Sequence, residues 1–167
     1  MKKIIIGVMG PGSDATNKDI KNAYTIGSLI AKNGWIVLSG GMNHGVMDAV
    51  NKGAKENNGL TLGILPTDDK TKYSKWLDIQ VITNLRSGRN YINVLSSDVV
   101  IACGISAGTT SEIALAIQAG KQIILLNDNE DSKVFFKKLA EKQIHIVKDP
   151  EEAIMITKKI LSKEQEI

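Results

Sequence analysis

Short runs of isoleucine and valine alternate along the chain with segments of helical periodicity, and this alternation limits the possible folds more than any other feature. Nearly continuous apolar runs are typical of strands that are buried on both faces, and the segments between them are the crossovers that parallel strands require. We expect strands at Ile4–Met9, Ile36–Leu38, Leu60–Ile64, Val99–Ala102, Gln122–Leu126 and Ile144–Val147. The sequence therefore predicts an α/β fold, a Rossmann-like three-layer αβα sandwich with a mostly parallel sheet.

Apolar residues at helical spacing mark the crossover helices, and a glycine follows two of these series. The clearest series are Ala23, Ile26, Ile30 and Ala31 before Gly34, and Ile113, Ala116 and Ile117 before Gly120. A last helix is expected to begin at Asp149–Pro150–Glu151–Glu152, which provides a cap, a first-turn proline and an acidic first turn. The stretch Pro66–Asn84 is the least regular, and it is long enough to be a functional loop.

Size and composition exclude several classes of protein. A chain of 167 residues with 43% hydrophobic content fits one domain, which we expect to span residues 1–167. No apolar run approaches the ~20 residues that span a bilayer, so we expect a cytoplasmic protein with no membrane partner. Cys103 is the only cysteine, which argues against a disulfide framework or a Cys-rich metal site. A net charge of +3 with dispersed lysines gives little reason to expect a nucleic-acid partner.

Arg86 and Arg89 are the only arginines among 21 basic residues, and they lie in one short segment. A guanidinium group stays charged and can donate two parallel hydrogen bonds to a phosphate or a carboxylate, which an ammonium group cannot do. The segment is therefore a candidate anion-binding element. Chance clustering together with a structural ion pair is the alternative.

Glycines cluster at three junctions between an expected strand and the helix that follows it. In open parallel sheets ligands bind at the carboxyl ends of the strands, so function is sought at these junctions. The first, residues 7–13, lacks the third glycine of a dinucleotide-binding fingerprint. The second contains Gly40, Gly41 and Gly45, which would let backbone N–H groups approach an anion at the start of a helix. A turn used only for close helix packing is the alternative.

The third junction, residues 103–112, directly follows the expected strand Val99–Ala102. The start of its helix offers backbone donors and hydroxyl groups to a phosphate from Gly108, Thr109, Thr110 and Ser111. Glu112 lies one turn into this helix. Thr109 and Glu112 also have the Thr-x-x-Glu spacing of a capping box, which would explain the glutamate without any ligand.

Taken in order, these residues resemble the LOG family, also called lysine-decarboxylase-like, whose members include cytokinin riboside 5′-monophosphate phosphoribohydrolases. The family pattern has a glycine triplet followed by x-x-Gly-Leu-Met, an arginine shortly before an Asp-initiated strand, and Pro-Gly-Gly-x-Gly-Thr-x-x-Glu. The resemblance covers residues 36–126. The matching positions are Gly40, Gly41, Gly45 and Met47 for the first element, Arg89 and Asp98 for the second, and Gly108, Thr109 and Glu112 for the third.

Two departures from the family pattern bear on function. Met42 stands where the family has its third glycine, and Gly104–Ile105–Ser106 stands where it has Pro-Gly-Gly. The side chains of Ile105 and Ser106 then occupy positions at which the family brings bare backbone close to a nucleotide. The chain, with Gly-Ile-Leu-Pro at residues 63–66, looks closer to a branch akin to molybdenum cofactor carrier proteins, which bind a phosphorylated pterin and catalyse no reaction.

The resemblance implies a phosphorylated small-molecule ligand, either a nucleoside monophosphate or a molybdopterin-type compound, and requires no further cofactor or metal. As the resemblance implies, we expect a phosphoribohydrolase-like protein that cleaves the N-glycosidic bond of a nucleoside 5′-monophosphate to give a free base and ribose 5-phosphate. Arg89 would hold the nucleotide, and Glu112 would stabilise the positive charge that develops on the ribose. The ligand-binding positions implied are Gly40, Gly41, Gly45, Met47, Gly104, Gly108, Thr109 and Thr110.

A binding or carrier protein would use the same site without turnover, and this alternative is left open at this point. Whether the chain is an enzyme is therefore not decided by its residues. With either function, the resemblance suggests a homodimer or a higher homo-oligomer.

Overall fold

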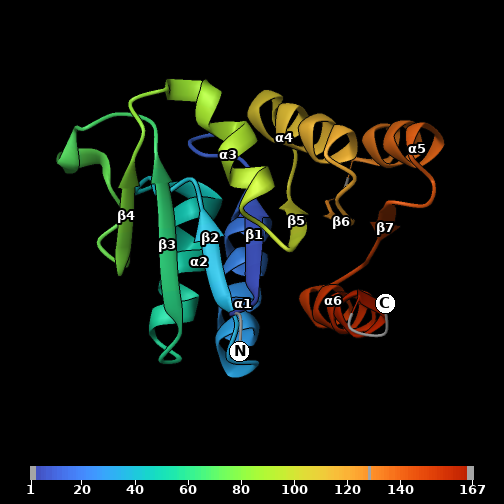
Figure 1. Ribbon diagram of the computed structural model, residues 1–167, viewed down its shortest axis with the longest axis horizontal. Coiled ribbons are helices and arrows are strands. Elements are labelled where there is room, and N and C mark those ends of the chain that lie inside the picture. The colour runs from blue at the N-terminus through green and yellow to red at the C-terminus, as the bar shows by residue number, and fades with distance from the viewer. Residues whose placement is uncertain (1–2, 128, 165–167) are drawn as a thin grey trace.

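The computed structural model describes residues 3–127 and 129–164; residues 1–2, 128 and 165–167 of the expected domain lie outside the described part. Within it, seven parallel strands form one sheet in the order β4-β3-β2-β1-β5-β6-β7 (Figure 1). They are β1 (Ile5–Met9), β2 (Ile36–Ser39), β3 (Leu60–Leu65), β4 (Ile79–Ile82), β5 (Val99–Cys103), β6 (Ile123–Leu126) and β7 (Ile144–Ile146). The predicted Rossmann-like α/β class is confirmed.

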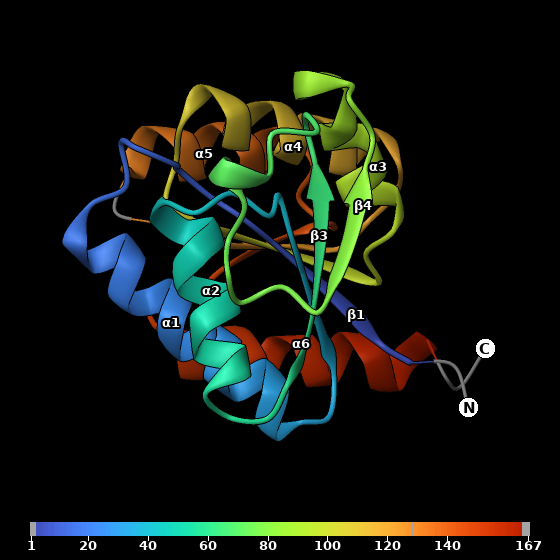
Figure 2. The ribbon, with the colours of Figure 1, turned by 90° about the vertical axis from the view of Figure 1, so that its left-hand side faces the viewer.

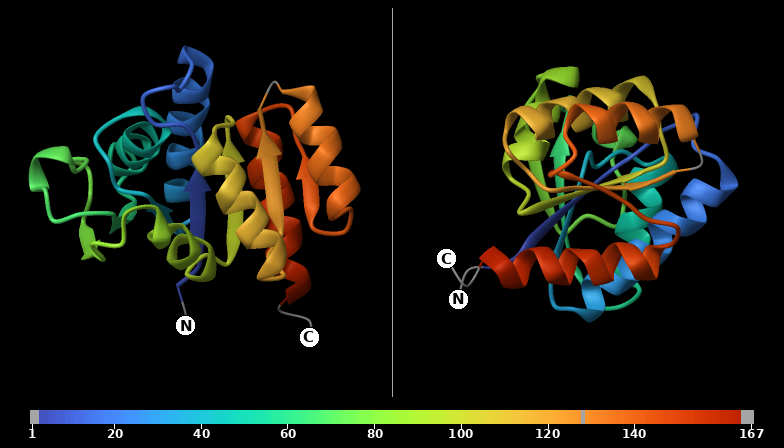
Figure 3. Two further views of the ribbon diagram at one scale, coloured as in Figure 1. Left: turned by 90° about the horizontal axis from the view of Figure 1, so that it is seen from above. Right: turned by 90° about the vertical axis from the view of Figure 1, so that its right-hand side faces the viewer.

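Helices cover both faces of the sheet. One layer contains α1, α2 and α6, and the other contains α3, α4 and α5, as the edge-on views show (Figures 2 and 3). The helices are α1 (Asn17–Lys32), α2 (Gly45–Lys55), α3 (Arg89–Leu95), α4 (Ala107–Gln118), α5 (Glu130–Leu139) and α6 (Pro150–Glu164), with short 3-10 turns at Lys70–Lys72 and Arg86–Gly88. None of the helices in the described residues is long and apolar enough to cross a membrane.

The two helical layers enclose two apolar cores, one on each face of the sheet. Ile6 and Val8 of β1 belong to the core under α1, α2 and α6, whereas Met9 belongs to the core under α3, α4 and α5. Successive side chains of a strand point to opposite faces, so a strand covered on both faces must be apolar at every position. This double burial is the physical reason for the uninterrupted isoleucine and valine runs in the sequence.

Strand β4 was not predicted and lies within Pro66–Asn84, which we had expected to be irregular. All four of its residues are exposed, although they pair with β3. Its sequence Ile-Gln-Val-Ile contains three β-branched residues, which are typical of a strand, so the interpretation of this stretch as irregular missed a local signal. Helix α3 is only seven residues long, and Phe136 is the buried residue of α5, so neither helix shows the full periodicity of the predicted ones.

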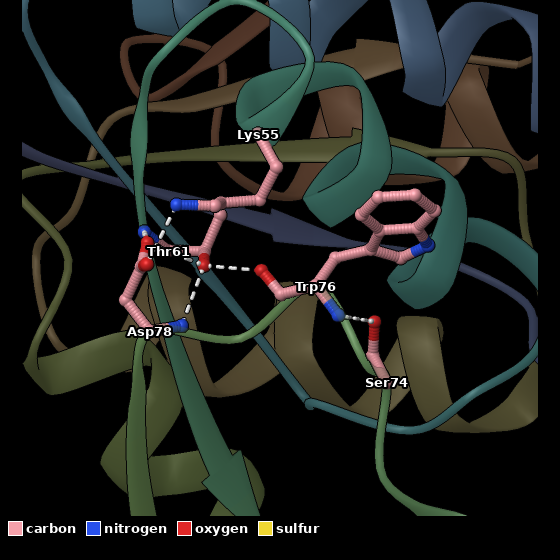
Figure 4. A network of polar contacts seen from close by, with 5 residues as sticks. All are labelled: Lys55, Thr61, Ser74, Trp76 and Asp78. Atoms are coloured by element: carbon pink, nitrogen blue, oxygen red, sulfur yellow. Dashed lines mark hydrogen bonds and ion pairs between the residues drawn. The ribbon is translucent and has the colours of Figure 1, made fainter.

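A polar network holds the start of β4 against β3 (Figure 4). The Lys55 ammonium lies 2.6 Å from the Asp78 carboxylate, which also accepts from the Thr61 backbone N–H at 2.9 Å. The Thr61 hydroxyl donates to the Trp76 carbonyl at 2.6 Å and accepts from the Asp78 backbone N–H at 3.0 Å. These contacts come from α2, β3 and the loop before β4. They help to hold the edge strand in place, since its side chains are not buried.

The order of the strands creates a switch point between β1 and β5. From β1 the chain proceeds to β2, β3 and β4 on one side, and from β5 it proceeds to β6 and β7 on the other. The two central strands pair from Ile6 beside Val99 to Met9 beside Ala102, so they end at the same edge of the sheet. The loops that leave them there diverge to opposite faces, which opens the crevice where ligands bind in such sheets.

Candidate functional site

A cavity of about 290 Å³ lies at this edge of the sheet. Its walls come from the end of β1 and the loop after it, from the turn after β2 and from α2. The segment between β3 and α3 and the first turns of α4 complete it. The lining residues are Val8, Met9, Gly10, Gly12, Gly40, Met47, Pro66, Arg86, Ser87, Arg89, Asn90, Ser106, Gly108, Thr109 and Glu112.

The start of α2 is packed directly on the loop that follows β1. The Val46 backbone N–H donates to the Pro11 carbonyl at 3.0 Å. Gly45 has a φ of +61°, and a Cβ atom there would lie 2.1 Å from the Gly12 carbonyl oxygen. Only glycine permits both the left-handed backbone and this close approach. Gly45 therefore fixes the position of one wall without itself lining the cavity.

Arg89 begins α3, and its guanidinium group reaches back to the ends of two strands. Nη1 donates to the Gly40 carbonyl at 2.5 Å and to the Ile64 carbonyl at 2.6 Å. Nε is buried and has no partner among the described residues. Burial lowers the pKa of Arg89, and attraction by the Glu112 carboxylate acts in the opposite direction. The guanidinium therefore ties the ends of β2 and β3 together and also supplies positive charge to the cavity.

Glu112 brings a buried carboxyl group into the cavity from α4; its side chain is 8% exposed. Oε1 accepts from the Asn93 side-chain amide at 3.0 Å, and the Asn93 Oδ1 atom has no partner within the described part of the chain. Burial raises the pKa of Glu112 to about 7, although the Asn93 hydrogen bond and the charge of Arg89 act to lower it. A carboxyl group in this state can change protonation near neutral pH, and it can donate as well as accept a hydrogen bond.

Ser106 caps α4, and this contradicts the capping-box alternative for Glu112. The Ser106 hydroxyl accepts from the Thr109 backbone N–H at 3.2 Å and lies 2.9 Å from the Thr109 hydroxyl. The first turn of α4 contains no acidic residue. N–H groups at the start of a helix have no acceptors within the helix, and the helix dipole favours an anion there. The Ser106 hydroxyl pairs with the N–H of Thr109, and the neighbouring Gly108 lines the cavity, so the positive end of the α4 dipole lies at the cavity.

The structure separates the ten predicted site residues into two groups. Six of them line the cavity: Arg89, Glu112, Gly40, Met47, Gly108 and Thr109. The other four are Gly41, Gly45, Gly104 and Thr110, which are not part of its lining. Gly41 and Gly104 have φ values of +74° and +80° and contact neighbouring segments closely, whereas Thr110 is exposed on α4. These glycines shape the loops around the cavity and do not contact its interior.

Several lining residues were not among the predicted ones. Gly10 and Gly12 belong to the first junction, which we had assessed only as a dinucleotide fingerprint, and Pro66 ends the run Gly-Ile-Leu-Pro. Arg86 had been named with Arg89 as part of a candidate anion-binding segment, but not among the site residues. Their position in the sequence could have identified these residues, because each lies next to the end of a strand at the same edge of the sheet. Among the described residues, no group of three or more His, Cys, Asp or Glu side chains is placed to hold a metal ion.

Comparisons with known proteins agree with this architecture. The family model described as LDcluster4: SLOG cluster4 family matches residues 3–154. An uncharacterized protein of Archaeoglobus fulgidus is 41% identical over 126 residues, which are 75% of this chain and 82% of that protein.

Two solved structures are similar over almost the whole chain. The molybdenum cofactor binding protein of the phototrophic bacterium Rippkaea orientalis is 52% identical, with a TM-score of 0.95, over 96% of this chain and 99% of that one. The molybdenum cofactor carrier protein of Chlamydomonas reinhardtii is 41% identical, with a TM-score of 0.92, over 96% and 99% of the two chains. The resemblance to a LOG-like family with a branch of molybdenum cofactor carriers is confirmed.

Proposed function

The chain belongs to the SLOG cluster4 family, and we propose that it is a carrier that binds the molybdenum cofactor in the cavity between β1, β2 and α4 without chemical turnover. The observation that most supports this proposal is the similarity, over almost the full length of both chains, to the cofactor-binding protein of Rippkaea orientalis. The cofactor is the cargo here, so the site must hold a phosphorylated pterin and release it intact.

The lining of the cavity suits the two halves of such a ligand. Met47 and Pro66, which are both partly exposed, provide apolar surface for a flat ring system. The start of α4, where Gly108 lines the cavity, provides the positive end of a helix dipole for a phosphate. The cavity therefore combines an apolar wall with an anion-binding end, as a phosphorylated pterin requires.

The state of Glu112 is compatible with ligand binding as well as with glycoside hydrolysis, because a carboxyl group with a raised pKa is also typical of the general acid of glycosidases. With a pKa of about 7, Glu112 is partly protonated at neutral pH. A protonated carboxyl group does not repel a phosphorylated ligand, and it can donate a hydrogen bond to a ring nitrogen or carbonyl group of a pterin. A phosphoribohydrolase that uses the same residues is the outcome against which the proposal is tested.

The direct test is to mix the purified chain with molybdenum cofactor released from a molybdoenzyme and to separate the complex by anaerobic gel filtration. Molybdenum and pterin should elute together with the protein, and the bound cofactor should reactivate a cofactor-free molybdoenzyme. In parallel, the chain is incubated with a panel of nucleoside monophosphates, and free base is sought by chromatography. Release of base without cofactor retention would replace the carrier with a hydrolase.

Gly108→Leu provides a variant that blocks the cavity. A Cβ atom at Gly108 would meet only the Ser106 hydroxyl, at 3.8 Å, so the larger side chain can be accommodated by the fold while it fills the anion-binding end. Cofactor retention should be lost with an unchanged melting temperature. Ala114→Leu is the matched control, because Ala114 is exposed on the same helix and does not line the cavity.

Self-association is also part of the proposal. Apolar side chains are exposed on the helical layer that contains α3 and α5, namely Tyr91, Leu95, Phe135 and Leu139. Exposed apolar area of this kind favours association between copies. Light scattering coupled to gel filtration should give a multiple of 18.1 kDa, and a mass of one chain at all concentrations would contradict this part.

A further inference from the structure

The two arginines at the cavity differ in what their side chains already contact. Nη1 of Arg89 is bonded to the carbonyls of Gly40 and Ile64, and its Nε is buried. Arg86 also lines the cavity, but it is exposed, and its guanidinium has no hydrogen bond or ion pair with the described residues. Of the two, Arg86 therefore has the guanidinium group that is free to meet a ligand from solvent.

The backbone of Arg86 supports the same conclusion. Its φ is +50°, in the left-handed region that favours glycine, and its N–H donates to the Pro66 carbonyl at 2.9 Å. Glycine occupies five other left-handed positions in the described chain: Gly34, Gly41, Gly45, Gly104 and Gly120. An arginine at such a position has a conformational cost that glycine would avoid. Side chains held in unfavourable backbone conformations are concentrated at ligand-binding sites.

We propose that Arg86, and not Arg89, is the arginine that binds the ligand's phosphate group, with its guanidinium across the cavity mouth from the start of α4. This inference rests on the proposed function, because it assumes that the ligand of the cavity carries a phosphate. A guanidinium group can donate two parallel hydrogen bonds to a phosphate, and the N–H groups at the start of α4 approach the same anion from the protein interior. Arg89 acts as a positioning residue that fixes the ends of β2 and β3.

Arg86→Gly separates ligand binding from structural support. It removes the guanidinium and also relieves the left-handed backbone, so the melting temperature should stay equal to that of the unchanged protein or rise. Affinity for inorganic phosphate, followed by NMR shifts of the Gly108 amide, should fall at least about tenfold. Arg86→Lys should lose most of the affinity as well, because lysine keeps the charge but lacks the paired donors.

Asn84→Gly is the matched control. Asn84 has a φ of +53° in the same loop, and it does not line the cavity. This variant relieves the backbone without removing a cation, so its phosphate affinity should stay within about twofold of the unchanged protein. Equal loss of affinity in Asn84→Gly and Arg86→Gly would assign the effect to loop conformation and overturn the proposal.

Two further outcomes separate this inference from the carrier proposal. If the unchanged protein binds phosphate through Arg86 but does not retain the molybdenum cofactor, the carrier proposal fails and the role of Arg86 stands. If the protein retains the cofactor and Arg86→Gly does so equally well, the carrier proposal stands and the role of Arg86 fails. Absence of any phosphate-dependent shift in the unchanged protein also overturns the inference.

Discussion

Replacing Glu112 with glutamine should change the stability of the protein in a strongly pH-dependent way. An ordinary glutamate has a pKa of 4.5, and burial raises the pKa of Glu112 to about 7. Between these two values the native state keeps a proton that the unfolded state has released. Raising the pH through this range therefore destabilises the native protein, because the carboxyl group must finally ionise in a buried site.

The size of this destabilisation follows from the same two pKa values. Each unit of pKa difference corresponds to about 1.4 kcal/mol. Ionisation of Glu112 should therefore destabilise the native state by roughly 3 kcal/mol above about pH 8 and by almost nothing below about pH 4. Glutamine resembles the protonated acid and stays neutral. Asn93, whose Oδ1 atom has no partner among the described residues, can turn its amide to accept a hydrogen bond from the new side chain. The advantage of Glu112→Gln should therefore increase with pH.

Urea unfolding of the unchanged protein and Glu112→Gln at intervals from about pH 5 to about pH 8 measures this difference directly. Glu141→Gln, at an exposed position after α5, controls for the loss of one negative charge. Any constant offset between the proteins reflects packing and hydrogen bonding, whereas the slope with pH reflects ionisation. A free-energy difference that stays constant over this range would show that Glu112 is ionised throughout and would refute the reasoning.

Four other substitutions test the architecture of the protein. Arg89→Ala should lower the free energy of unfolding by about 2–4 kcal/mol, because two strand-end carbonyls lose a charged donor; urea unfolding would contradict this if the loss were below about 1 kcal/mol. Gly45→Ala should destabilise the protein far more than Gly120→Ala, which should cost about 1–2 kcal/mol. Both positions have positive φ, but only the Cβ atom at Gly45 would meet backbone atoms within 4 Å, so equal shifts in melting temperature would refute the steric argument. Asp78→Asn should cost about 1 kcal/mol at neutral pH. Partial burial acts to raise the pKa of Asp78, but hydrogen bonds, above all the one from Lys55, lower this pKa overall. The stabilisation by the Asp78 carboxylate should therefore disappear as the pH falls below about 4. A cost of Asp78→Asn that persists in acid would contradict this.

The sequence by itself determined the fold class and the edge of the sheet where the site lies. Both depend on local features: apolar runs report burial on two faces, helical spacing reports the crossovers, and turn residues report where strands end. Because all parallel strands end at the same edge, glycine-rich junctions far apart in the chain could be assigned to one region before their contacts were known. Arg89 and Glu112 were identified in the same way, with the help of the family pattern.

Only the tertiary structure decided what each of these residues contacts. The partners of the Arg89 guanidinium are carbonyls 49 and 25 residues away, and Asn93 meets Glu112 across two helices. Such contacts depend on which strands are neighbours, and local periodicity does not specify that order. The edge strand β4 was missed for a different reason, because its Ile-Gln-Val-Ile sequence, although rich in β-branched residues, was assigned to the irregular stretch Pro66–Asn84. Arg86 and Arg89, three residues apart, differ in burial and in hydrogen-bond partners, which their shared chemistry could not reveal.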